Sequence, residues 1–351
     1  MDDLWRRIGT WKSRSKSAPD ISATQNKPQV SKLSRNELVL LGKPAKRFNL
    51  ADVNRASKQK LGKAPLERTY KAELEDGITT VVVKMLGDVV LRAKEFRDKV
   101  KTIRTMDHEN LLPLRGYFYS EDQKFLLYDY MPLGSLSDQL QGRVTPLSWE
   151  VRLSIALGAA RAIEHLHAQN GHHGNFKSSK VLLTPSYEAR VSDYGLTLFP
   201  TRAGGDGANQ ARAGWAQGRK ADVRAFGVLL LDLLEVTPPS ETLYNGRADF
   251  LTSVHSVFLE MGVAGVFGRR YHDLDEKLLK LAIDCASVAF NSRNGPRTPM
   301  LEVRRRIEEL CKLGVIIGTK DMSSWFIPGA QVDRDSQLYQ FCKVDNDMRT
   351  R

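Results

Sequence analysis

The segment HHGNFKSSKVLL, residues 172–183, brings polar side chains of several chemical kinds together in a short stretch of chain. The Asn175 amide can donate and accept hydrogen bonds, but it cannot act as a general base at neutral pH. Lys180 carries a positive charge that can neutralise a phosphate group. SDYG at 192–195 then adds the carboxylate of Asp193, which taken alone is an ordinary turn residue. What these groups can do depends on the elements that position them.

The first half of the sequence reads mainly as strands. TTVVVKML, residues 79–86, is the clearest strand of the chain, and Lys84 lies near its end. The predicted elements are a short helix capped by Asn49 or Asp52, strands within 61–86 around a turn at 76–77, a helix at about 90–105, and strands at 112–120 and 123–131.

The second half is rich in helical patterns. Ser148 is a typical N-cap for a helix with one buried face, and residues 220–236 are apolar on all sides, which predicts a central, covered helix. Further amphipathic helices are expected at 275–290 and 299–313. The order is therefore a strand-rich part followed by a helix-rich part.

Composition and charge narrow the class of protein. The 351 residues are 41% hydrophobic and 27% charged, as in a folded globular protein. Three widely spaced cysteines, Cys285, Cys311 and Cys342, form no metal-ligand pattern and favour a reducing compartment. No transmembrane or secretory pattern is visible, so we expect a chain that faces the cytosol.

The formal net charge of +12 is concentrated near the start, where residues 1–60 hold 14 Lys and Arg against 5 Asp and Glu. We expect residues 1–46 to be a basic, flexible segment. It could contact an anionic membrane surface, with Trp5, Ile8 and Trp11 at the interface, or it could be a solvated linker. No aromatic platform accompanies the charge, so nucleic acid is not expected as a partner.

Seven motifs occur in an order and spacing that resemble one family. They are LGK…TYKAELEDG, VVVKML, HENLLPLRGYFYS, LLYDYMPLGSL, HGNFKSSKVLLT, ARVSDYGL and ADVRAFGVLLLDLL. The chain resembles the protein kinase-like domain of plant leucine-rich-repeat receptor-like kinases, particularly the inactive members. The resemblance implies an α+β, two-lobed kinase-like domain over 47–312, with a small strand-rich N-lobe (about 47–131), a larger helical C-lobe (about 132–312) and a tail at 313–351.

The resemblance also assigns roles, several of which have lost their usual residue. Lys84 matches the family's phosphate-pairing lysine. Gly62 is the glycine that remains in a phosphate loop where Ala64 and Glu67 replace the other two. Lys99 stands where the family has the glutamate that pairs with the strand lysine, with Glu95 and Asp98 as neighbouring carboxylates. Phosphoryl transfer depends on such positioning and charge neutralisation.

The catalytic loop and metal positions are altered as well. Asn175 replaces the family's general base, whose loss typically costs about 10² to 10⁴ in rate. Lys180 replaces the asparagine that holds a second magnesium ion, while Asp193 retains the main metal-binding carboxylate. The substrate-docking A-P-E motif is missing, which removes the expected partner of Arg297.

The nucleotide pocket is predicted to be narrow. The resemblance places adenine at the hinge formed by Tyr128, Asp129 and Met131, with Tyr128 as a bulky gatekeeper. Val82 and Thr69 also differ from the usual pocket residues. We therefore expect ATP binding to be weak or absent, and Mg²⁺ binding to depend on Asp193 alone.

Two functions remain open at this point. The first is a pseudokinase that acts as a signalling scaffold or allosteric partner of another kinase or receptor complex, in the cytoplasm and at the inner face of the plasma membrane if the basic segment binds lipid. The second is a weak or unconventional protein Ser/Thr kinase that uses Lys84, Asp193 and one metal ion, with Lys180 supplying charge. The resemblance implies an outer repeat region and a membrane span that these 351 residues do not include.

Overall fold

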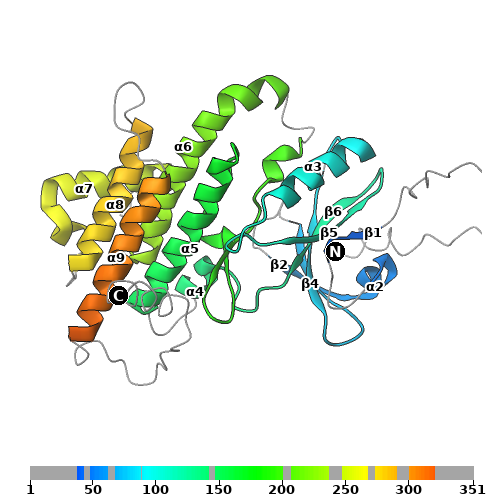
Figure 1. Cartoon of the computed structure of the whole chain (residues 1–351), viewed down its shortest axis with the longest axis horizontal. Coiled ribbons are helices and arrows are strands. Elements are labelled where there is room, and N and C mark those ends of the chain that lie inside the picture. The colour runs from blue at the N-terminus through cyan, green and yellow to red at the C-terminus, as the bar shows by residue number, and fades with distance from the viewer. Residues whose placement is uncertain are drawn as a thin grey trace, which may run out of the picture. The chain divides into compact units, whose positions relative to one another are not determined.

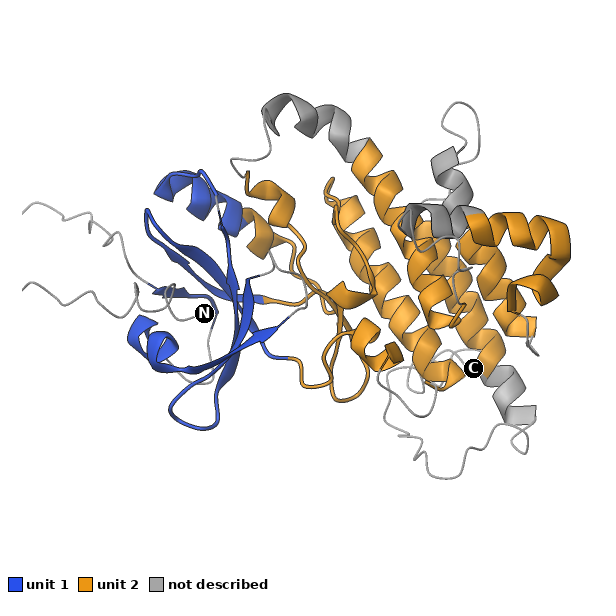
Figure 2. Ribbon diagram, turned by 180° about the vertical axis from the view of Figure 1, so that it is seen from behind, with its two compact units in different colours: residues 1–101, 114–130, 201–203 blue, residues 102–113, 131–200, 204–351 orange. Residues whose placement is uncertain are grey.

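A computed structural model gives the structure of residues 38–42, 48–61, 68–87, 89–141, 147–200, 207–236, 247–267, 273–290 and 300–320. The chain divides into two compact units, residues 1–101, 114–130 and 201–203 in the first and the remainder in the second (Figure 2). The first unit is built on a sheet and the second on helices (Figure 1). The α+β class and its division into strand-rich and helical parts are thus confirmed.

Several sequence-based expectations lie outside the described residues. These are most of the basic segment 1–46 with its three apolar residues, the phosphate-loop glycine, Arg297, Cys342, and the part of the predicted tail beyond residue 320. Among the residues that are described, no helix is long and apolar enough to cross a membrane.

The first unit contains a six-stranded antiparallel sheet with the strand order β1-β5-β6-β4-β3-β2. Its strands are β1 (Leu38–Leu40), β2 (Ser57–Leu61), β3 (Thr69–Glu73), β4 (Thr80–Met85), β5 (Leu114–Tyr119) and β6 (Lys124–Asp129). The predicted turn between β3 and β4 is present: Gly77 has φ +67°, and the Asp76 carboxylate accepts hydrogen bonds from the Ile78 and Thr79 backbone N–H groups at 3.0 and 2.8 Å.

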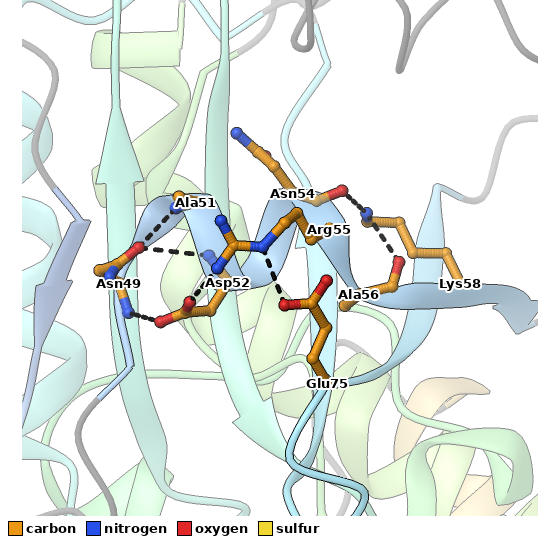
Figure 3. A network of polar contacts seen from close by, with 8 residues as sticks. All are labelled: Asn49, Ala51, Asp52, Asn54, Arg55, Ala56, Lys58 and Glu75. Atoms are coloured by element: carbon orange, nitrogen blue, oxygen red, sulfur yellow. Dashed lines mark hydrogen bonds and ion pairs between the residues drawn. The ribbon is translucent and has the colours of Figure 1, made fainter.

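The helix α2 (Leu50–Arg55) is closed at both ends by side chains, as Figure 3 shows. Asn49 caps its start and Asp52 completes a capping box, so the predicted cap is confirmed. At the other end, the Lys58 ammonium donates hydrogen bonds to the carbonyl oxygens of Asn54 and Ala56 at 2.7 and 3.1 Å. Partial burial lowers the pKa of Lys58. These contacts fix a helix of only six residues that could not persist alone.

Strand alternation gives the sheet two different faces. One face packs against α2 around Val53, and its buried side chains are Ala72, Leu74, Val81, Val83, Phe118, Phe125 and Leu127. The other face meets α3 (Ala93–Thr105), whose Phe96 lies 5.9 Å from Tyr117 and 5.3 Å from Tyr119 between ring centroids. The predicted helix at 90–105 is therefore present and begins three residues later.

The second unit is organised around long helices, which lie side by side in Figure 1. They are α5 (Trp149–Ala168), α6 (Gly207–Leu233), α7 (Arg247–Phe267), α8 (Asp273–Phe290) and α9 (Met300–Lys320), and the short helix α4 (Leu136–Gln141) precedes them in the chain. Helix α6 packs against α8 and α5 packs against α9. Ser148 caps α5, as predicted. Burial raises the pKa of the Cys285 thiol to about 12, so this cysteine is an inert part of the core.

Two helices are longer than the sequence indicated. Helix α6 begins at Gly207 instead of residue 220, and α9 continues to Lys320, into the predicted tail. Buried Arg152 fixes the far end of α6, because its guanidinium donates to the Leu233 carbonyl oxygen at 2.6 Å and to the Leu147 carbonyl oxygen at 2.8 Å. It also pairs with Glu235 at 2.8 Å.

Candidate functional site

A short antiparallel hairpin brings the two charged residues of the catalytic motifs together. It consists of β7 (Val181–Leu183) and β8 (Ala189–Val191), with Val181 paired to Val191. Lys180 directly precedes β7 and Ser192 directly follows β8, so this register places them opposite each other. The Ser192 backbone N–H and hydroxyl both donate to the Lys180 carbonyl oxygen, at 2.8 and 3.1 Å.

The Lys180 ammonium forms an ion pair with Asp193 at this hairpin. Its Nζ lies 2.7 Å from Asp193 Oδ2, and the two side chains are only 10% and 11% exposed. Asp193 has φ +66°, an unfavourable conformation for a residue with a Cβ atom. Removal of one partner from a buried ion pair typically costs about 3–5 kcal/mol, so this contact matters to the local structure.

The loop before the hairpin is held by a buried carboxylate. Asp222 in α6 is 1% exposed and accepts hydrogen bonds from the backbone N–H groups of His173 at 2.6 Å and Gly174 at 2.9 Å. His167 Nε2 lies 3.0 Å from the same carboxylate. Hydrogen bonds to an ionised acceptor are strong, and these fix the backbone at the centre of the candidate site.

The His173 ring has a defined tautomer. Its Nε2 can only donate to the Ser192 carbonyl oxygen, 2.8 Å away, while its Nδ1 accepts from the Asn175 N–H at 3.3 Å. The ring is therefore neutral. Burial lowers the pKa of His173 and outweighs the opposing influence of Asp222 and of the hydrogen bond to Ser192. His173 thus acts as a structural connector.

Asn175, which the sequence resemblance assigns to the general-base position, is exposed. An amide oxygen cannot take a proton from a substrate hydroxyl at neutral pH. Just before it, Gly174 has φ +80°, and a Cβ atom at this position would lie 2.7 Å from Thr197 Cγ2. The backbone conformation of the loop therefore requires glycine.

Helix α6 lies directly against the loop. A Cβ atom at Gly218 would come within 2.5 Å of the His172 ring, and Arg219 Nη1 donates to the His167 carbonyl oxygen at 3.4 Å. The extra turns of α6 lie in the part of the sequence where the substrate-docking segment was predicted to be rebuilt or missing.

In the first unit, one face of the sheet holds four of the residues predicted to line a nucleotide pocket. The register pairs Thr69 with Lys84 and Val82 with Tyr128, which places all four on the face opposite the α2 cluster. Tyr128 is 3% exposed. Lys84 Nζ donates to Thr69 Oγ1 at 3.5 Å. These four residues therefore share one surface of the sheet.

Helix α3 contains Lys99, the residue predicted to stand where the family has its helix glutamate, and the neighbouring carboxylate of Glu95. Lys99 is half-buried in α3. Glu95 accepts a hydrogen bond from the Arg92 backbone N–H at 3.0 Å, so its carboxylate caps the start of α3.

The residues predicted to form the hinge make local contacts. Asp129 pairs with Arg115 at 2.6 Å, and the Met131 carbonyl oxygen accepts a hydrogen bond from the Gly134 N–H at 3.0 Å.

The metal position of the family does not fit a divalent ion in this chain. Mg²⁺ needs several oxygen ligands at about 2.0–2.1 Å. Residue 180 supplies an ammonium instead of an amide oxygen, and that ammonium already pairs with Asp193. In the part of the chain that the structure describes, no cluster of three or more His, Cys, Asp or Glu side chains could hold a metal ion.

The ion pair and the Asp222 contacts were not predicted from the sequence. The sequence shows Lys180 and Asp193 in two separate motifs. That they form an ion pair follows only from the register of β7 and β8. Asp222 was recognised as part of a helix motif, whereas its backbone acceptor role depends on how α6 meets the loop.

Comparison with known proteins places these features in a family context. The family model described as protein tyrosine and serine/threonine kinase matches residues 56–254. The chain is 42% identical over 309 residues to the probable inactive receptor kinase RLK902 of Arabidopsis thaliana, covering 82% of this chain and 47% of that protein. It is 40% identical over 295 residues to the probable inactive receptor kinase At1g48480 of the same plant, covering 78% and 44%.

A solved structure is also similar. It is the pseudokinase domain of BIR2, described as an immune regulator of the RLK/Pelle family, with a TM-score of 0.65 and 26% identity over 84% of this chain and 95% of that one. The predicted resemblance to the receptor-like kinases is confirmed. The chain spans less than half the length of the two Arabidopsis relatives.

Proposed function

The chain belongs to the protein tyrosine and serine/threonine kinase family, and we propose that it acts there as a pseudokinase, a signalling scaffold or allosteric partner in a receptor-like kinase pathway. The observation that carries this proposal is the ion pair between Lys180 and Asp193. It commits the family's metal-binding carboxylate to an ammonium, while Asn175 leaves the loop without a base.

The alternative, a weak kinase that uses Lys84, Asp193 and one metal ion, requires Asp193 to ligate that metal. The ion pair favours the scaffold over this alternative, because Asp193 would first have to release Lys180. Nucleotide binding would be weak or absent, because buried Tyr128 and Val82 lie on the candidate pocket face. Binding of a protein partner would then depend on the folded surface of the chain and not on catalytic activity.

The proposed partner is the cytoplasmic domain of an active receptor-like kinase. Support comes from relatives that are named inactive receptor kinases and from the neighbour described as an immune regulator. The proposed location is the cytoplasm, at the inner face of the plasma membrane if the basic N-terminal segment contacts anionic lipid.

A phosphate-transfer assay tests the proposal. The purified chain is incubated with radiolabelled ATP, Mg²⁺ or Mn²⁺ and a generic protein substrate, beside Lys84→Met as the matched control. We expect equal, background incorporation for both proteins. Incorporation that depends on Lys84 would overturn the proposal. Binding to kinase domains of receptor-like kinases, measured by calorimetry, should be the same for the unmodified chain and for Asn175→Ala, because scaffolding does not use that amide.

A further inference from the structure

The contact between Lys180 and Asp193 lies at the position where kinases of this family hold a metal ion. Its two charged atoms are 2.7 Å apart and nearly buried, and the backbone on both sides is fixed by the two hydrogen bonds from Ser192 to the Lys180 carbonyl oxygen. The hairpin therefore positions the Lys180 ammonium beside the Asp193 carboxylate, and the contact is not one between two exposed surface side chains.

A metal ion and this ammonium compete for the same carboxylate. A divalent cation bound to Asp193 would have to enter within a few ångströms of a fixed positive charge, and like charges repel strongly where water is scarce. Residue 180 also lacks an oxygen that could ligate the metal. In this chain the residues at the two metal-binding positions, Lys180 and Asp193, have opposite charges and form an ion pair with each other.

We propose that Lys180 is a built-in cation that permanently replaces the divalent metal ion at Asp193, so that the turn at 192–195 keeps its conformation without metal or nucleotide. This inference deepens the proposed function, because it rests on Asp193 being the family's metal position. It makes the fold of the second unit insensitive to metal ions. It also predicts that one substitution, Lys180→Asn, reopens the metal site.

The turn beside the pair shows what the cation stabilises. Asp193 is held at φ +66° and is followed by Gly195 at φ +72°. A Cβ atom at Gly195 would lie 2.7 Å from Ile103 Cγ1, so the turn is pressed closely against the end of α3. Loss of the ammonium would remove a positive charge from beside this nearly buried carboxylate. An added metal ion could then supply the missing charge.

The test is thermal unfolding of the full chain with and without millimolar MnCl₂ or MgCl₂, in the absence of nucleotide. We expect no metal response from the unmodified chain. Lys180→Asn should unfold several degrees lower and recover part of that loss with Mn²⁺, as expected when a ligand binds only the folded state. Lys180→Asn combined with Asp193→Asn should lose the response. Lys280→Asn, which removes the same charge from an exposed pair with Glu276, is the matched control.

Direct binding supplies a second measurement. The electron paramagnetic resonance signal of free Mn²⁺ should fall when Lys180→Asn is added and should not fall with the unmodified chain. If Lys180→Asn does not fold, Lys180→Gln replaces it, because glutamine also supplies a neutral amide oxygen. Binding of Mn²⁺ by the unmodified chain, or the same lack of response in the folded variants, would overturn the proposal.

These readouts separate the inference from the proposed function. They contain no phosphate-transfer step, so metal binding by the unmodified chain without turnover would overturn only the inference. Turnover that depends on Lys84, in a chain that shows no metal response by itself, would overturn only the scaffold proposal.

Discussion

His173 Nε2 donates a hydrogen bond to the Ser192 carbonyl oxygen at 2.8 Å, which joins the loop before β7 to the residue before Asp193. The bond requires a neutral ring with its proton on Nε2, because Nδ1 is occupied by the Asn175 N–H. Burial lowers the pKa of His173, so protonation of this ring is disfavoured in the folded protein.

Stability should therefore fall in acid. Below about pH 6.5 the unfolded chain takes up a proton that the buried His173 ring resists, so the free energy of unfolding decreases as pH falls, by up to about 1.4 kcal/mol per pH unit for this group. Denaturant titrations between pH 7.5 and about pH 5 should show this slope, and His173→Gln should reduce it.

Phe176→Leu is the matched control for this experiment. The Phe176 ring lies 5.6 Å from the His173 ring, so the variant disturbs the same region but keeps the titrating group. An unchanged acid slope in His173→Gln, or a slope lost equally in Phe176→Leu, would contradict the assignment.

Gly174→Ala should destabilise the protein by about 3 kcal/mol. The left-handed conformation costs a non-glycine residue roughly 1–2 kcal/mol, and the new methyl would also collide with Thr197 Cγ2. Gly77→Ala provides the comparison, since Gly77 has φ +67° with nothing within 4 Å of a Cβ atom, and should lose only the conformational part. Chemical denaturation measures both; equal losses would show that the contact with Thr197 is unimportant.

Arg152→Met should lower the free energy of unfolding by about 2–4 kcal/mol, because the carbonyl oxygens of Leu147 and Leu233 lose a buried donor. The same substitution at Arg306, whose side chain is 42% exposed and pairs with Asp284, should cost less than about 1 kcal/mol. Calorimetric unfolding of the two variants gives the comparison. A small effect at Arg152 would mean that α6 does not need this anchor.

Asn175→Asp should fail to create a kinase. The substitution restores a carboxylate at the exposed loop position. Lys180 still forms its ion pair with Asp193, however, and the sequence contains no A-P-E motif. We expect phosphate incorporation to stay at the background of Lys84→Met, with thermal stability changed by no more than a few degrees. Turnover at an ordinary kinase rate of about 1–100 s⁻¹ would show that the missing base was the sole defect.

Local signals in the sequence were sufficient for much of the fold. Asn49 and Ser148 are N-cap types followed by periodic apolar residues, and the predicted turn at Asp76 and Gly77 needs a side-chain acceptor and a positive φ. Each of these features depends on residues within one or two turns of chain. They could therefore be found without knowledge of the tertiary structure.

Features that depend on distant contacts were harder to predict. The start of α6 at Gly207 was missed because residues 207–219 contain glycine and little apolar periodicity, so nothing local marks a helix beginning there. The Lys180 to Asp193 pair depends on two three-residue strands that carry too weak a pattern to be recognised. The capping contact of Glu95 with the Arg92 backbone N–H was not predicted either, because it depends on where α3 begins.

Helix α6 is 27 residues long, which corresponds to about 40 Å of continuous helix. Its Asp222 accepts hydrogen bonds from the backbone N–H groups of residues 173 and 174, and Arg152 donates a hydrogen bond to the Leu233 carbonyl oxygen in its last turn. A protein that binds the first turns of α6 and displaces this helix must therefore move the loop as well. Such a partner would change the position of residues 173 and 174 without any nucleotide.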